Sequence, residues 1–140
     1  MFIEENELKN SFWDNYKNRS SIKGYQFESN IRNGCADLLT IELFQDKVQI
    51  NTFEFKLTDI KKALAQAEAN LKFSHRCFVV LPANKEKVIR DKYDFFLKSK
   101  KYIGVIVVED GGRWNMIYKA SSQPDSNVTI SQEVLKILIK

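Results

Sequence analysis

The fold is decided by residues 35–57, which read CADLLTIELFQDKVQINTFEFKL. Two apolar runs flank the polar pair at 45–46, and each run alternates as a strand with two different faces does. If the chain turns at this pair, Ile41 meets Ile50 on one face, and polar residues meet polar ones on the other. A loop over 44–47 gives the same register. A slip by one residue would mix the two kinds of side chain, so the pattern predicts an antiparallel hairpin in this register.

The same register places Asp37 directly opposite Glu54, with Lys56 two positions further along that face. Directly opposed Cβ atoms lie about 4.5–5.5 Å apart, and two carboxylates at that distance repel each other. A divalent cation between them would remove the repulsion, and Mg²⁺ takes oxygen ligands of this kind. A nearby lysine could then orient a water molecule or stabilise a developing negative charge.

The remainder of the chain alternates between strands and helices. The predicted helices cover 3–17, from Thr58 or Asp59 to about Phe73, 84–100, and a last segment capped by Ser131. The predicted strands cover 25–31, 35–44, 47–57, 77–82, 102–110 and 113–120, with a turn at Asn33-Gly34. The order αβββαβαββα predicts one α/β domain over residues 1–140, with a mixed sheet flanked by helices.

The composition is that of an ordinary globular domain with a mild basic bias. Hydrophobic residues make up 44% of the 140 residues, charged residues 29%, and the formal net charge is +4. This charge is compatible with an anionic partner. No apolar run approaches the ~18 residues of a membrane span, and the acidic N-terminus does not resemble a signal peptide. With Cys35 and Cys77 expected as free thiols, we predict a cytoplasmic protein without a membrane partner.

The arrangement of Asp37 followed by Glu54-Phe55-Lys56 on a hairpin that leads into a helix resembles the PD-(D/E)XK nuclease superfamily. The likeness covers roughly residues 3–82 and implies a restriction-endonuclease-like fold. It also implies that Asp37, Glu54 and the main-chain carbonyl of Phe55 are metal ligands, with Mg²⁺ or Mn²⁺ as the cofactor and Lys56 as the catalytic lysine. The chain departs from the pattern in having no proline before the Asp.

Two further site residues are suggested by the same resemblance. Many members add an acidic residue on the first helix, where this chain offers Glu4, Glu5 and Glu7. At about 100° per residue, Glu5 falls nearest the centre of the apolar face, so it is the predicted one. Some members carry a Gln on the helix after the lysine, with a Tyr four residues on. Gln66 fits the first position but Asn70 stands at the second, so a solvated helix face remains the alternative for Gln66.

The resemblance implies a metal-dependent nuclease that hydrolyses phosphodiester bonds of nucleic acid, with DNA as the expected substrate. A chain with one such site would cut one strand per visit, so cutting both strands implies a homodimer. The first alternative is a nucleic-acid-binding or regulatory protein of the same fold without catalytic activity. The second is an interaction module that docks a partner through its VLKILIK tail at 134–140. Metal-dependent cleavage separates the nuclease from the binder, and salt-sensitive binding separates the binder from the module.

Three other features of the sequence are interpreted as structural. The lysines within 84–101 predict a solvated helix face, with a phosphate-contacting patch as the alternative. His75 is predicted to be a loop histidine, since it stands alone before a strand. The aromatic residues Phe95, Phe96 and Trp114 are predicted to lie in the core.

Overall fold

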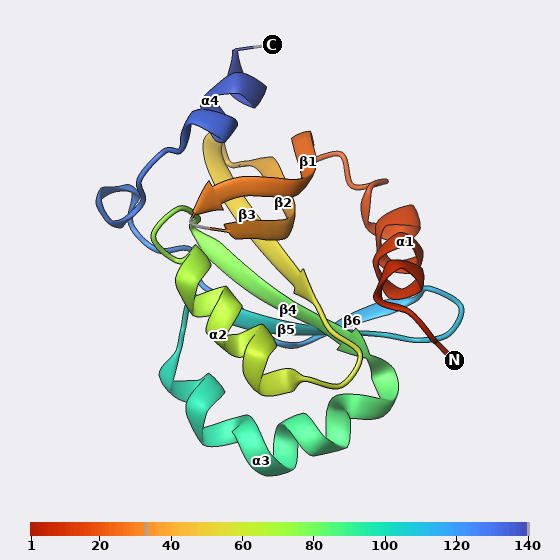
Figure 1. The fold of residues 1–140 in the computed structure, drawn as a ribbon. Helices are drawn as coiled ribbons and strands as arrows, with labels where there is room; N and C mark the ends of the chain where they lie inside the picture. The colour runs from red at the N-terminus through yellow and green to blue at the C-terminus, as the bar shows by residue number, and fades with distance from the viewer. Residues whose placement is uncertain (33, 140) are drawn as a thin grey trace.

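A mixed six-stranded sheet with helices on both faces forms the fold (Figure 1). The computed structural model describes residues 1–32 and 34–139. Its elements are α1 (Glu5–Tyr16), β1 (Ile22–Arg32), β2 (Gly34–Phe44), β3 (Lys47–Phe55), α2 (Ile60–Asn70), β4 (Arg76–Pro82), α3 (Glu86–Ser99), β5 (Ile103–Val108), β6 (Trp114–Tyr118) and α4 (Gln132–Leu138), with 3₁₀ turns η1 (Ala83–Lys85) and η2 (Asp125–Asn127). The predicted α/β class and element order are confirmed. The turn expected at Asn33-Gly34 includes Asn33, which is outside the described residues.

The strands lie in the sheet in the order in which they occur in the chain. β1, β2 and β3 form an antiparallel meander, β3, β4 and β5 run parallel, and β6 returns antiparallel to β5. Parallel neighbours need a long crossover, which α2 and α3 provide. Both crossover helices cover the same face of the sheet (Figure 1). Because β3, β4 and β5 are parallel, their carboxyl ends lie at the same end of the sheet.

Each face of the sheet has its own apolar core. On one face, α1 packs Leu8 and Phe12 against aromatic side chains of the central strands, among them Phe53 and Phe78. On the other face, α2 and α3 pack against alternate residues of β4 and β5. The short helix α4 adds Val134 to a third cluster over the β1–β3 meander. A strand pair buried on both faces explains the unbroken apolar runs of β4 and β5.

Two helices expose apolar residues, and one of these, Phe95, was predicted to lie in the core. Phe95 is 89% exposed, because it lies about 200° around α3 from the buried Leu97. Phe96 and Trp114 do pack against the core clusters. On α4 only Val134 is buried, while Leu135 and Leu138 are each about two-fifths exposed. Within the described ranges, no helix has the length and apolar character needed to cross a membrane.

Candidate active site

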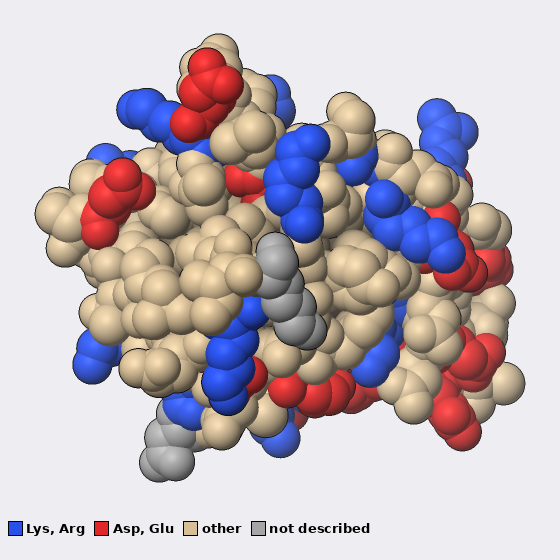
Figure 2. Space-filling model, turned by 90° about the horizontal axis from the view of Figure 1, so that it is seen from above, with Lys and Arg blue, Asp and Glu red and all other residues tan. Residues whose placement is uncertain are grey.

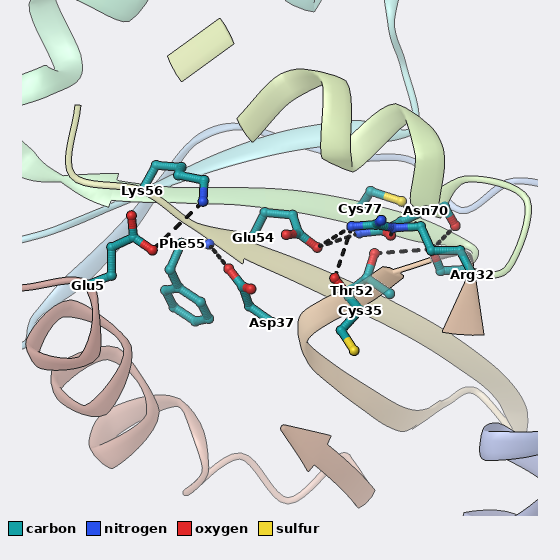
Figure 3. A network of polar contacts seen from close by, with 11 residues as sticks. Glu5, Arg32, Cys35, Asp37, Thr52, Glu54, Phe55, Lys56, Asn70 and Cys77 are labelled. Atoms are coloured by element: carbon teal, nitrogen blue, oxygen red, sulfur yellow. Dashed lines mark hydrogen bonds and ion pairs between the residues drawn. The ribbon is translucent and has the colours of Figure 1, made fainter. Parts of the chain in front are cut away.

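The β2–β3 hairpin has the predicted register. Its seven pairs run from Phe44 opposite Lys47 to Leu38 opposite Phe53, so the prediction is confirmed over that length. Asp37 and Glu54 are the next residues on each strand. The backbone ladder between β2 and β3 ends before this pair. The Phe55 backbone N–H donates instead to the side chain of Asp37, whose Oδ2 accepts at 2.8 Å (Figure 3).

Glu54 is the most buried acid of the site. Its side chain is 0% exposed, and Oε2 accepts from Asn70 Nδ2 of α2 at 2.8 Å. Arg32 Nη2 lies 3.9 Å from the same oxygen, while Oε1 has no hydrogen-bond partner among the described residues. Burial, together with the negative charge of Asp37, raises the pKa of Glu54 to about 7. The free oxygen and the raised pKa both indicate a carboxylate whose burial is only partly compensated by its partners Asn70 and Arg32.

A third acid, Glu28 of β1, lies across from Asp37. The pairs Phe27–Leu38 and Ser29–Ala36 flank this position on the β1–β2 ladder. Burial raises the pKa of Asp37, the Phe55 N–H opposes it, and the negative charge of Glu28 adds to the rise. Glu28 has a left-handed backbone with φ 50°, and its carboxylate also pairs with Lys9 at 3.4 Å. Glu28, Asp37 and Glu54 therefore occupy successive positions on three neighbouring strands.

Lys56 follows the end of β3 and lies beside the first helix. Its Nζ is 3.7 Å from Glu5 Oε1, and the lysine side chain is 14% exposed. Glu5 is the acid that the structure brings toward the hairpin, with its side chain about half exposed (Figure 3). Glu4 and Glu7 instead form the capping box that begins α1. The structure therefore brings Glu5 together with Lys56, at the Asp37 side of the hairpin.

Gln66 lies on α2, one turn before Asn70. Its side-chain oxygen Oε1 is buried without a partner among the described residues. Within those residues, no hydrogen bond joins Gln66 to Asp37 or Glu54. Asn70, at the position where the family pattern would have a tyrosine, is the α2 residue that contacts Glu54. Gln66 therefore carries a second buried acceptor without a partner among the described residues, and no contact joins it to the two acids.

Three contact residues were missed by sequence reasoning: Glu28, Arg32 and Asn70. A turn centred on 33–34 would pair Glu28 with Leu39, and the irregular ladder between Ser29 and Arg32 shifts it to Asp37. Arg32 donates from Nε to Asn70 Oδ1 at 2.7 Å and from Nη2 to the Cys35 carbonyl at 2.9 Å. No sequence signal predicts these contacts between the first hairpin and α2.

The donor set of the site suits a hard cation bound with few protein ligands. Asp37 and Glu54 offer carboxylate oxygens, one of which is buried and unpartnered. Over residues 1–32 and 34–139, no group of three or more His, Cys, Asp and Glu side chains lies close enough to hold a metal ion together. Mg²⁺ usually binds through one or two protein carboxylates and completes its shell with water and substrate phosphate. Asp37 and Glu54 therefore fit Mg²⁺ better than a metal that needs a complete protein cage.

Comparisons with known proteins bear on the fold alone. No family model matches the chain, and no curated protein matches it. Among solved structures, the chain is similar to the SPO1766 protein of unknown function from Silicibacter pomeroyi, with a TM-score of 0.53 and 14% sequence identity. The match covers 96% of this chain and 78% of that one. It supports the α/β architecture over nearly the whole length of the chain.

Proposed function

We propose that the protein is a metal-dependent nuclease of the PD-(D/E)XK type, which hydrolyses phosphodiester bonds of nucleic acid, with DNA as the expected substrate. The observation that carries the proposal is the pair Asp37 and Glu54 on neighbouring strands, with Glu54 buried and one of its oxygens unpartnered. A restriction-endonuclease-like fold is part of the proposal. The antiparallel meander that leads into two parallel crossover units supports it.

Asp37 and Glu54, with the main-chain carbonyl of Phe55, would hold Mg²⁺ or Mn²⁺. The bound cation would lower the pKa of a water molecule and neutralise phosphate charge, which is the chemistry that phosphodiester hydrolysis requires. The protein contributes rigidity, because the Phe55 N–H fixes Asp37 and Asn70 fixes Glu54. A bound cation would also offset the burial that, together with nearby negative charge, raises the pKa of both acids.

Lys56 is the proposed catalytic lysine. Its mostly buried ammonium group can donate hydrogen bonds to a phosphate oxygen and stabilise the negative charge that grows there. The half-exposed Glu5 carboxylate lies 3.7 Å from Lys56 Nζ and keeps this ammonium group positioned at the Asp37 side. Glu5 would thus orient Lys56, and this role does not require Glu5 to contact the cation.

One contact favours the alternative of a nucleic-acid-binding or regulatory protein without catalytic activity. The Arg32 guanidinium lies 3.9 Å from Glu54 Oε2, where its positive charge competes with a cation for the carboxylate. In that case Arg32 would serve as a permanent substitute for the metal, and Asp37 and Glu54 would be structural. The two candidates differ in whether any divalent cation supports cleavage.

The test pairs cleavage with binding in the Asp37→Asn variant. The substitution removes a ligating charge, while the Asn oxygen can still accept from the Phe55 N–H and preserve the fold. We expect cleavage with Mg²⁺ or Mn²⁺ to be abolished, and nucleic-acid binding without metal to be unchanged or stronger, since one acid near the phosphates is gone. The panel comprises labelled single-stranded, duplex and branched DNA and RNA.

The matched control is Asp46→Asn, which removes the same charge from an exposed turn of the same hairpin. It should cleave as the wild type does. Undiminished cleavage by Asp37→Asn would contradict the proposed mechanism. A wild type that binds nucleic acid but cuts no substrate of the panel with either metal would establish the non-catalytic alternative.

A further inference from the structure

A second polar cavity lies away from the candidate active site. It has a volume of about 410 Å³ and is lined by side chains that include Arg19, Arg76 and Glu42. Glu42 follows Asp37 by five residues on β2, which is about 17 Å along a strand. The two acids also lie on opposite faces of the sheet, because their side chains alternate. The cavity is therefore independent of the proposed nuclease site.

Glu42 at the base of this cavity is fully engaged by the protein. Its Oε2 accepts from Tyr16 at 2.7 Å, from Thr40 at 2.8 Å and from Asn51 at 3.0 Å. Burial alone would raise the pKa of Glu42, but these hydrogen bonds outweigh it and hold the pKa below its ordinary value. Glu42 thus contributes one fixed negative charge and has little capacity left for a ligand.

Two guanidinium groups line the cavity together with that single carboxylate. Arg19 lies over the rings of Tyr16 and Trp114, at 5.0 and 5.9 Å, and its Nη2 is 3.9 Å from Glu42 Oε1. Arg76 lies over the ring of Phe78 at 5.6 Å and donates from Nε to the neutral Asn51 amide at 3.0 Å. Among the ion pairs of the described residues, none involves Arg76. Its charge is held rigidly and is not balanced by an acid.

Hydroxyl groups complete the lining. Ser21, Ser121 and Ser122 border the same cavity as the two arginines, and the last two are exposed. Rigid guanidinium groups with hydroxyl donors beside them match the oxygens of a phosphate group. Ser21 already donates to Glu42 Oε1 at 3.3 Å. We propose that this cavity binds a phosphate monoester through Arg19, Arg76 and the hydroxyls of Ser121 and Ser122. The volume exceeds what inorganic phosphate fills, which leaves room for the esterified group.

A phosphate monoester can belong to a free small molecule or to the end of a nucleic-acid strand. Calorimetric titrations without divalent metal use inorganic phosphate and two short oligonucleotides that differ only in a 5′-phosphate. We expect the wild type to bind phosphate, and the Arg76 Nε–H signal in the NMR spectrum to shift on binding. A preference for the phosphorylated oligonucleotide assigns the strand end, and equal binding of the two oligonucleotides assigns a free ligand.

Two variants test the site in different ways. Arg76→Gln removes the unbalanced charge and should weaken binding about tenfold or more. Ser122→Asp places a carboxylate at the exposed rim without touching the core, so it should abolish binding in a folded protein. The control Arg113→Gln removes the same charge from an 82% exposed side chain and should bind as the wild type does. The proposal is wrong if the wild type binds none of the probes, or if both variants bind as tightly as the control.

Discussion

At the scale of the residue, the ionised form of Glu54 is strongly disfavoured by its surroundings. It is fully buried beside Asp37, and the contacts from Asn70 and Arg32 reach only one of its two oxygens. Burial without a complete set of partners is costly for a carboxylate, and the folded protein responds by holding a proton up to a pH of about 7. This is the state of the site in the absence of a cation.

The pH dependence of stability should report this effect. In the unfolded chain Glu54 loses its proton near 4.5, whereas in the folded chain it keeps it to about 7. The free energy of unfolding of the wild type, relative to that of Glu54→Gln, should therefore fall as the pH rises from about 4.5 to about 7. Above pH 7 this difference should stay constant. The pKa displacement corresponds to about 3 kcal/mol.

Chemical denaturation of metal-free protein between pH 5 and 9 measures this difference. The control is Glu109→Gln, which removes a charge from a half-exposed side chain and should show no such trend. A difference between the wild type and Glu54→Gln that stays constant over the whole range would show that Glu54 is ionised in the folded protein throughout.

At the scale of the element, the β2–β3 hairpin sets the register on which the site depends. Its turn residues Gln45 and Asp46 both have left-handed backbones, with φ of 51° and 65°. Two-residue hairpin turns favour this conformation, but it costs an ordinary residue about 1 kcal/mol or more. The alternating faces of the strands therefore hold the register without a favourable turn sequence.

Asp46→Gly should stabilise the protein by roughly 1 kcal/mol, because glycine adopts the left-handed region without steric cost. Asp46→Val should destabilise it by a similar amount or more, since a β-branched residue fits that region poorly. Thermal unfolding of both variants measures the effect, and the proposed nuclease activity should not change in either. Equal stability of the two variants would contradict the hairpin turn described for residues 45–46.

The elements differ in how well local sequence specifies them. The faces of residues 38–53 determine the central hairpin. Ser131 begins α4 as predicted, and Asp59, one of the two predicted candidates, begins α2; each side chain accepts a backbone N–H. The contacts of Glu28 and Asn70 were not predictable. Glu28 depends on an irregular ladder, and Asn70 meets Glu54 only because α2 folds back against β3, the strand that precedes it. Local patterns carry no information about either.

At the scale of the whole molecule, one face carries positive charge that is spread rather than gathered. Figure 2 shows the face over which α4 lies, where lysine and arginine side chains appear singly around a largely uncharged centre. The formal net charge of +4 thus acts as a weak general attraction for an anionic polymer on this face. Specific recognition would have to come from the site itself.

Binding of nucleic acid to metal-free protein should fall steeply with salt. Each phosphate that a lysine or arginine neutralises releases counterions, so the logarithm of the affinity should decrease linearly with the logarithm of the salt concentration. A fluorescence titration of labelled DNA at several NaCl concentrations gives the slope. Binding that is unaffected by salt would contradict a nucleic-acid partner and favour an interaction module.

Binding of a divalent cation by Asp37 and Glu54 together can be tested without knowing the substrate. Mn²⁺ is paramagnetic and broadens NMR signals near its binding site. At substoichiometric Mn²⁺, we expect loss of the Phe55 backbone amide and of the Asn70 side-chain amide, which contact the two carboxylates. Excess Mg²⁺ should restore both signals, Asp37→Asn should abolish the broadening, and Asp46→Asn should preserve it. Broadening that is centred elsewhere, or that persists in Asp37→Asn, would contradict the account.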